Sequence, residues 1–241
     1  MEKSKDVKLL IILIILLLAI NYPFLDRQLT NFLSTDEEVL VSRIIDGDTI
    51  EAENWNSSIR LLGINTPERG ELFYEEARQF LESRILNKNV TLRFGRERYD
   101  KYDRTLAYVF LDRKNVNREL IENGFANYYF PSGRDSYYED FLTAWKICIE
   151  NNVNLCEKSG DICVECIELK NSETLINTCS FSCNLDGWKL KAEGRDNIIL
   201  TDSAFNSGEE FEFNLNPTET GDTIFLWDDN GKLVFWERFG S

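Results

Sequence analysis

The sequence has no histidine among its 241 residues, and this absence excludes several classes of mechanism. Without imidazole, the chain has no Ser-His-Asp triad, no HExxH zinc site and no histidine general base. Acid–base chemistry therefore falls to carboxylates, Lys, Tyr or Cys. Proline and glycine are also scarce, with 4 and 13 residues, which argues against long disordered segments. We expect a folded protein with room for two domains.

Positive charge is in deficit, with 27 Lys and Arg against 42 Asp and Glu and a net charge of −15. The deficit is largest in residues 148–241, which carry 7 basic and 18 acidic side chains. A surface this acidic is not expected to bind a polyanion. Most arginines lie in residues 36–147, so we place any chemistry on phosphate there.

An uninterrupted apolar run occupies residues 9–20 and follows Lys3, Lys5 and Lys8. It predicts one N-terminal hydrophobic helix, which residues 21–25 extend toward the length needed to reach across a membrane. The sequence lacks the small-residue motif of a signal-peptidase site, so we favour an uncleaved anchor in residues 9–25. The folded domains would then lie outside the cytoplasm; cleavage would instead give a secreted protein.

The pattern of apolar residues changes type along the chain. The first part alternates strands with amphipathic helices. This order predicts an α+β domain, a five-stranded OB-type barrel with three helices. Strands are expected at residues 38–45, 49–53, 58–62, 90–94 and 104–111, and helices at 71–86, 117–123 and 135–151.

After Cys156 the chain is all-β, with short strands separated by Asn, Asp, Gly and Ser. Asn230-Gly231 predicts a tight hairpin turn, because these residues tolerate positive φ angles. Strands at this spacing predict a C-terminal β-sandwich. We therefore divide the chain into residues 1–35, 36–156 and 157–241, with the linker near residues 152–162.

All six cysteines lie in the last hundred residues: Cys148, Cys156, Cys163, Cys166, Cys179 and Cys183. In an exported chain, an even number of cysteines favours disulfides, and sequence alone leaves 15 pairings open. The alternative is a four-thiolate zinc site from the last four. A strand over residues 163–169 would place Cys163 and Cys166 on opposite faces, which disfavours zinc.

Three charged segments stand at predicted turns or strand ends: residues 46–49 (DGDT), 60–68 (RLLGINTPE) and 100–108 (DKYDRTLAY). Phosphodiester hydrolysis needs a cation or arginines to neutralise charge, a base to activate water, and fixed geometry. Aspartates suit Ca²⁺, arginine forks suit phosphate, and Glu68 beside a proline-stiffened turn suits a base. Each segment alone is weak, but their combination favours a nuclease site.

These segments resemble the staphylococcal nuclease-like, or thermonuclease, family over about residues 38–156. The resemblance implies an OB barrel that binds one Ca²⁺ and cleaves DNA and RNA through an activated water. Asp48 and the Thr66 carbonyl would be metal ligands. Glu68 would be the general base, with Arg60 and Arg104 stabilising the transition state. Lys101 and Tyr102 match positions that contact a nucleotide phosphate.

Two positions depart from the family pattern. Asn65 stands where the family has a second metal-ligating aspartate. An amide oxygen still ligates Ca²⁺, but the lost charge predicts weaker binding unless a neighbour such as Asp46 compensates. Cys156 stands where the family often has Trp, and it suggests a bridge to Cys148 that fixes the last helix; two unrelated core thiols remain the alternative.

The tail resembles the lamin-tail domain, an immunoglobulin-like sandwich, in residues 166–171, 185–191, 208–211 and 221–226. That resemblance implies an interaction module whose ligand or protein partner is unknown, without catalysis.

Taken together, the sequence predicts a membrane-anchored, Ca²⁺-dependent nuclease acting on DNA or RNA, with no oligomer expected. The alternative is a catalytically silent nuclease-like module that acts with the sandwich as a surface interaction protein. Because the surrounding charge repels nucleic acid, nuclease activity should depend strongly on salt.

Overall fold

The computed structural model describes residues 36–194, 197–201, 204–215 and 222–239, which belong almost entirely to one compact unit, Glu38–Ser241. The predicted N-terminal helix and anchor, residues 9–25, lie outside the described residues. Within the described ranges, no helix has the length and apolar character needed to cross a membrane.

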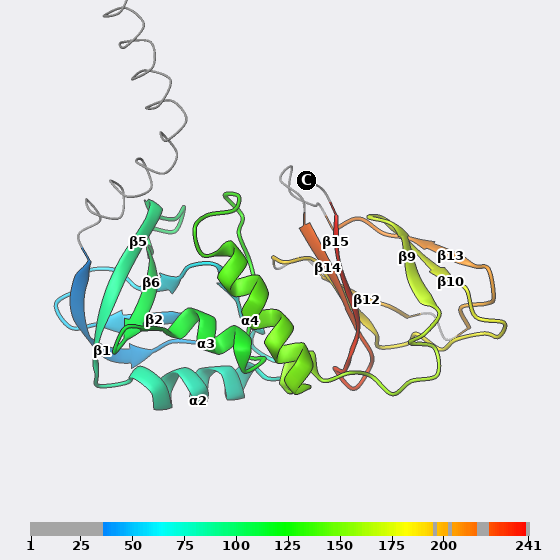
Figure 1. Cartoon of the computed structure of the whole chain (residues 1–241), viewed down its shortest axis with the longest axis horizontal. Helices are drawn as coiled ribbons and strands as arrows, with labels where there is room; N and C mark the ends of the chain where they lie inside the picture. Colours follow the sequence, from blue (N-terminus) through cyan, green and yellow to red (C-terminus); the bar gives the residue numbers. More distant parts are fainter. Residues whose placement is uncertain (1–35, 195–196, 202–203, 216–221, 240–241) are drawn as a thin grey trace, which may run out of the picture. The chain divides into compact units, whose positions relative to one another are not determined.

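Five strands form a closed barrel (Figure 1). They are β1 (Glu37–Ile44), β2 (Thr49–Ala52), β3 (Ile59–Leu61), β5 (Asn89–Tyr99) and β6 (Thr105–Leu111). The order is β3-β2-β1-β5-β6, and parallel pairing of β3 with β6 closes the sheet. The short β7 (Lys114–Asn115) extends the edge of β6. Alternating apolar side chains fill the interior, so the predicted five-stranded OB-type barrel is confirmed.

Three helices accompany the barrel, as expected: α2 (Tyr74–Ile85), α3 (Val116–Glu122) and α4 (Tyr138–Asn151). Two of them begin three residues later than the sequence indicated. Glu71 lies in the turn before α2 and accepts the Glu68 backbone N–H at 2.8 Å. Asp135 likewise accepts the Tyr137 N–H at 2.8 Å. These carboxylates therefore fix the turns that lead into the helices, and do not form their first residues.

A two-stranded sheet of β4 (Ile64–Asn65) and β8 (Asn127–Tyr128) was not foreseen. It pairs Asn65 with Asn127 in antiparallel register. Just before it, Gly63 adopts φ +74°, and a Cβ there would lie 2.7 Å from the Phe141 ring. Glycine therefore allows this turn to pack against α4, and the small sheet fixes the backbone of a predicted metal ligand.

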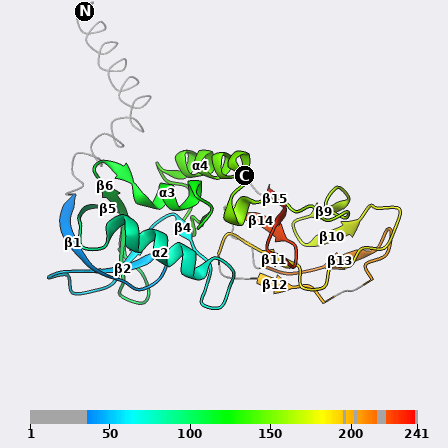
Figure 2. The ribbon, with the colours of Figure 1, turned by 90° about the horizontal axis from the view of Figure 1, so that it is seen from below.

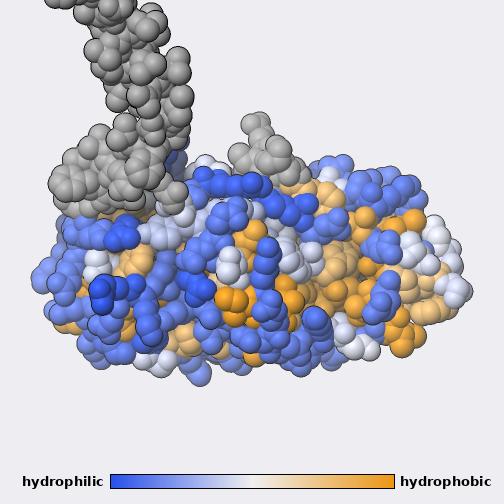
Figure 3. All heavy atoms as spheres, viewed as in Figure 1, coloured by the Kyte–Doolittle hydropathy of each residue, from blue (hydrophilic) through white to orange (hydrophobic). Residues whose placement is uncertain are grey.

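The C-terminal part contains two antiparallel sheets (Figure 2). On the face seen in Figure 3, hydrophilic residues predominate over the barrel and apolar ones are more frequent over these sheets. The predicted sandwich and the lamin-tail likeness stay predictions. The sheets are β13-β10-β9 and β12-β11-β14-β15, formed by β9 (Ile167–Asn171), β10 (Thr174–Asn177), β11 (Lys189–Lys191), β12 (Asn197–Ile199), β13 (Glu210–Glu212), β14 (Asp222–Trp227) and β15 (Leu233–Phe239).

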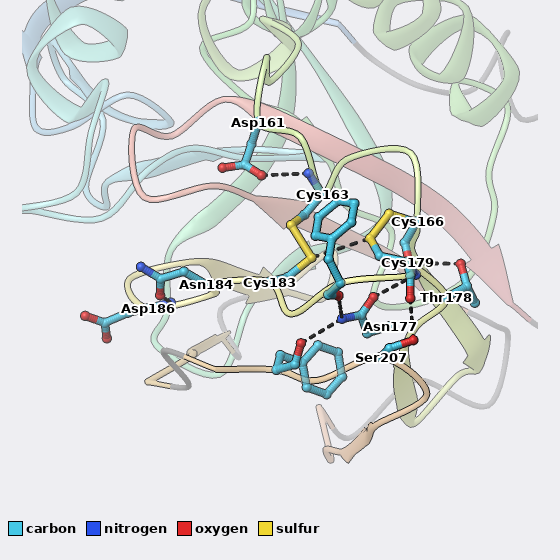
Figure 4. Close-up of a disulfide and its surroundings, with 12 residues drawn as sticks. Asp161, Cys163, Cys166, Asn177, Thr178, Cys179, Cys183, Asn184, Asp186 and Ser207 are labelled. Carbon is cyan, nitrogen blue, oxygen red and sulfur yellow. Dashed lines mark hydrogen bonds between the residues drawn. A yellow bond between two sulfur atoms is a disulfide. The ribbon is translucent and has the colours of Figure 1, made fainter.

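All six cysteines form disulfides: Cys148–Cys156, Cys163–Cys183 and Cys166–Cys179. The first joins α4 to the short helix η1 (Asn154–Cys156), as suspected from the sequence. The other two lie side by side (Figure 4). No cysteine remains free, as the disulfide prediction expects. The sulfurs of Cys163, Cys179 and Cys183 also lie within 4.8 Å of one another, an arrangement that could hold a metal ion, so the zinc alternative stays a prediction. The strand predicted from residue 163 begins only at Ile167, because Cys163 and Cys166 belong to a turn closed by the Cys166 N–H on the Cys163 carbonyl.

The C-terminal sheet packs directly against the barrel domain. Phe225 of β14 lies 5.2 Å from Trp145 of α4, ring centre to ring centre, and is fully buried. Leu233 of β15 exchanges backbone hydrogen bonds with Glu157 and Ser159. The segment expected to be a linker is therefore held against β15, while the boundary after Cys156 stays a prediction.

A buried polar network joins the two parts. Tyr128 and Thr223 share a hydrogen bond of 2.7 Å, and Thr223 Oγ1 donates to Glu193 at 2.8 Å. Arg238 Nη1 also donates to Glu193, at 2.7 Å. Burial, with the nearby Asp222 charge, raises the pKa of Glu193 to about 7 despite these bonds.

This network predicts that stability falls as pH rises. Because Glu193 titrates at a higher pKa in the folded chain than its usual 4.5, the folded state holds the extra proton between these values. The stabilising effect of protonated Glu193 is complete below about pH 4.5 and is lost above about pH 7. Glu193→Gln should remove on the order of 2 kcal/mol of this pH dependence. Urea unfolding at pH 5 and pH 8 measures it; equal pH dependence in both proteins would contradict the prediction.

Candidate active site

The turn between β1 and β2 places Asp48 at the centre of the site. Its N–H donates to Asp46 Oδ1 at 3.1 Å, which closes the turn. A Cβ at Gly47 would lie 2.9 Å from the Ala77 Cβ and 3.0 Å from the Thr66 Cβ. Glycine therefore lets the turn approach α2 and Thr66. Burial and the charge of Asp48 raise the pKa of Asp46 above its usual value.

Asp48 and Arg60 form a buried ion pair, with 2.9 Å between Oδ2 and Nη1 and only 9% of each side chain exposed. Asp48 Oδ2 also accepts the N–H and the hydroxyl of Thr66, at 3.1 and 2.9 Å. Arg60 donates to the carbonyls of Leu61 and Ile64, both at 3.0 Å. These contacts lock Asp48, Arg60 and Thr66 into one rigid cluster.

Asn65 lies next to this cluster and also contacts the C-terminal part, which the sequence did not indicate. Its Nδ2 donates to the Gly194 carbonyl at 3.0 Å, and its Oδ1 lies 3.5 Å from Arg60 Nη2. An aspartate has no N–H to donate to Gly194. The departure from the family pattern therefore has a structural role, the attachment of the C-terminal part.

The predicted metal ligands fit Ca²⁺ in type but are low in charge. Asp48, the Asn65 amide oxygen and the Thr66 carbonyl are oxygen donors on buried, adjacent residues, as Ca²⁺ prefers. Only one of them is a carboxylate, and Arg60 already pairs with it. Among the described residues, no three carboxylates converge as one metal-binding group. The site therefore fits a weakly held Ca²⁺.

Glu68, the predicted base, follows Pro67 and is exposed. Its backbone is fixed at both ends, because its N–H donates to the Glu71 carboxylate and its carbonyl accepts the Glu71 N–H at 2.8 Å. A fixed backbone with an exposed carboxylate suits a group that must meet water and substrate.

Arg104, Lys101 and Tyr102 come together in the loop between β5 and β6. Arg104 Nη2 and Nε both lie 2.7 Å from Asp100 Oδ2. Tyr102 is 62% exposed, and Lys101 Nζ lies 5.1 Å and the Arg104 guanidinium 5.4 Å from the centre of its ring. Burial opposes the charge of Asp100, but hydrogen bonds from Arg104 and the Tyr102 N–H lower its pKa below the usual value. Asp100 was missed as a site residue, although its spacing of four from Arg104 was visible.

A cavity of about 730 Å³ brings five of the eight predicted residues together: Arg60, Asn65, Lys101, Tyr102 and Arg104. Asp48, Thr66 and Glu68 do not line it; Asp48 contacts the lining residue Arg60, and Thr66 contacts Asp48. Cations on one wall and an exposed aromatic ring suit a phosphate and a base.

The C-terminal part supplies another part of the same cavity wall, which sequence analysis did not foresee. Ala192, Gly194, Leu215 and Asp222 line it. No local pattern signals this, because the contacts join residues more than a hundred positions apart.

The family model for staphylococcal nuclease homologues matches residues 58–157. Thermonuclease of Staphylococcus intermedius is 35% identical over 136 residues, which cover 52% of this chain and 81% of that protein. The chain belongs to the staphylococcal nuclease homologue family.

Other relatives agree with this assignment. Thermonuclease of Staphylococcus hyicus is 29% identical over 159 residues, 61% of this chain and 93% of that protein. An uncharacterized endonuclease of Haemophilus influenzae is 34% identical over 101 residues, 41% of this chain and 56% of that protein. Family membership and these relatives support a nuclease, a phosphodiesterase, as the class of enzyme.

Proposed function

We propose that this protein is a Ca²⁺-dependent nuclease that hydrolyses phosphodiester bonds of DNA, RNA or both. One observation carries the proposal: in a chain of a nuclease family, the buried Asp48–Arg60 pair adjoins a cavity that Arg60 shares with Arg104. Two arginines at one cavity match the charge of a phosphodiester and of its more highly charged transition state.

The roles of the side chains follow from their environments. Asp48, Asn65 and the Thr66 carbonyl would hold Ca²⁺, which would supply positive charge to stabilise the charged transition state. Glu68, exposed on a fixed backbone, takes the proton from the attacking water. Arg60 and Arg104 grip the phosphate, and Lys101 and Tyr102 hold the neighbouring nucleotide. Family resemblance supports all of these roles, and the shared cavity supports those of Arg60, Arg104, Lys101 and Tyr102.

Asn65→Asp tests the metal site directly. The variant restores a carboxylate, so the affinity for Ca²⁺ should rise several-fold, because ligand charge is a main control of that affinity. It also loses the hydrogen bond to Gly194 and sets a carboxylate against a carbonyl, so the melting temperature without metal should fall. Calorimetric titration with Ca²⁺ and thermal unfolding measure both effects. Unchanged affinity would show that residue 65 does not contact the metal.

We propose further that the folded part lies outside the cytoplasm, either anchored through residues 9–25 or secreted. The three disulfides support this, because such bonds persist in oxidising compartments. Anchored and cleaved forms differ by the mass of the N-terminal segment, so mass spectrometry of the exported protein distinguishes them.

Hydrolysis of denatured DNA and of RNA by the full chain, purified in mild detergent, tests the proposed activity. Cleavage should require Ca²⁺ and stop with chelator. It should also weaken steeply between about 50 and 200 mM salt, because salt weakens binding that depends on contacts with a few phosphates. A folded protein that cleaves neither substrate in millimolar Ca²⁺ would instead be the silent binding module.

A further inference from the structure

Lys191 of β11 lies on the face of the C-terminal sheet that is held against the nuclease site. Residues before and after Lys191 contact the barrel domain. Lys189 Nζ lies 2.5 Å from Glu71 Oε1, and the Gly194 carbonyl accepts the Asn65 amide at 3.0 Å. Residues two apart in a strand point to the same face, so Lys191 points toward the barrel as Lys189 does.

The surface opposite Lys191 carries the site residues. The attachments at Asn65 and Glu71 bracket the segment that holds Thr66 and Glu68. Lys191 lines a cavity of about 450 Å³ together with Pro67, Gly70 and Glu71 of that segment. Its own exposed fraction is only 4%. The Lys191 side chain is therefore enclosed beside the turn from Pro67 to Glu71, which contains the predicted base Glu68.

The charges around Lys191 are those of the site itself. Lys189 opposes its charge, and the carboxylates of Glu71, Glu68 and Asp48 favour it. Burial is the larger influence and lowers its pKa to about 8. No described carboxylate lies within 4.0 Å of the ammonium, so it is not consumed in a close ion pair. Lys191 thus faces several site carboxylates without being paired to one.

We propose that Lys191 is a positioning residue of the nuclease site. Its positive charge offsets the negative charge of Asp48 and Glu68, and so lowers the affinity of the site for a divalent cation. The inference rests on the proposed function, because it concerns the same metal site. In the absence of metal, the positive charge of Lys191 interacts favourably with the carboxylates of Glu71, Glu68 and Asp48. A divalent cation that enters meets this positive charge in a poorly solvated site, where repulsion is strong.

The proposal gives the C-terminal sheet a defined task. With Asn65 in place of a carboxylate, the site already holds less negative charge, and Lys191 reduces its net charge further. The sheet thereby sets how much Ca²⁺ the nuclease requires, through a residue that no local sequence pattern connects with the barrel.

Ca²⁺ titration of the full chain tests the proposal. Wild type, Lys191→Met and Lys191→Arg are compared by calorimetry and by the rise of melting temperature with Ca²⁺ concentration. Lys191→Met should bind Ca²⁺ about tenfold more tightly, since it removes a unit charge near the metal at nearly constant volume. Lys191→Arg retains the charge and should resemble wild type. Lys170→Met is the matched control, because Lys170 pairs with Glu210 on the other C-terminal sheet and should not alter Ca²⁺ binding.

Equal or weaker Ca²⁺ binding by folded Lys191→Met would overturn the proposal. If that variant folds only when Ca²⁺ is added, the metal has replaced the ammonium and the proposal is supported. If it folds under neither condition, Lys191→Gln is titrated in its place and decides by the same criterion. DNA cleavage is measured in parallel: cleavage by wild type with unchanged affinity in the variant defeats this inference alone, whereas tighter binding without cleavage defeats the nuclease proposal alone.

Discussion

Glu68→Gln is expected to reduce the rate of phosphodiester cleavage at saturating Ca²⁺ and substrate by about 10³-fold, as loss of a general base typically does. The amide retains the shape of the side chain but does not accept a proton from water. Because Glu68 is exposed and its backbone is held by Glu71, the substitution should leave the fold intact. Single-turnover cleavage of a labelled oligonucleotide measures the change.

Glu76→Gln is the matched control for this result. Glu76 is also an exposed glutamate and lies on α2. Its substitution by Gln removes the same charge away from the cavity. Its activity should remain within twofold of wild type, about 0.4 kcal/mol. Activity of Glu68→Gln within tenfold of wild type would remove Glu68 from the mechanism and leave the base unidentified.

Arg60→Met is expected to lower both stability and activity. The substitution leaves Asp48 buried without its ionic partner and the Leu61 and Ile64 carbonyls without their donor. Loss of one partner of a buried pair destabilises by about 3–5 kcal/mol. Loss of a transition-state arginine should reduce cleavage on the order of 10³-fold. Urea unfolding and cleavage kinetics measure the two effects.

Arg60→Lys separates these effects. Lysine keeps the charge near Asp48 but does not reproduce the three fixed contacts of the guanidinium, so stability should recover more than activity. Arg43→Met is the control, because Arg43 forms an ion pair with Glu51 on the neighbouring barrel strand but its side chain is 66% exposed. That variant should change stability by less than about 1 kcal/mol. A stable, fully active Arg60→Met would contradict both roles of Arg60.

Much of the barrel was predictable because its signals are local. Alternation in residues 90–94, which lie in β5, and helical spacing in the segment that forms α2 are signals within single elements. The pair β4 and β8 was missed, because strands of two residues are too short to show a period. The strand β10 was also missed, since Thr174–Asn177 is short and lies between polar residues. β5 runs to Tyr99, beyond its predicted end, through polar residues that show no apolar alternation.

The site was predictable only to the extent that a motif contains it. Arg60, Glu68 and Arg104 lie in recognisable segments, whereas Lys189 and Gly194 contact Glu71 and Asn65 across more than a hundred residues. The acidic C-terminal part was expected only to repel nucleic acid, yet its Asp222 lines the cavity. Sequence therefore indicated the chemistry of the barrel side and gave no indication of the opposite wall.

The hydrogen bond between Asn65 and Gly194 has an evolutionary consequence. One side chain serves as a predicted metal ligand and as an attachment point, and Gly194 offers it only a carbonyl oxygen. A single mutation to aspartate would improve the first property and damage the second. The two positions are thus epistatic: a lineage that acquired this C-terminal domain would find a stronger metal site only after a donor had first appeared near residue 194.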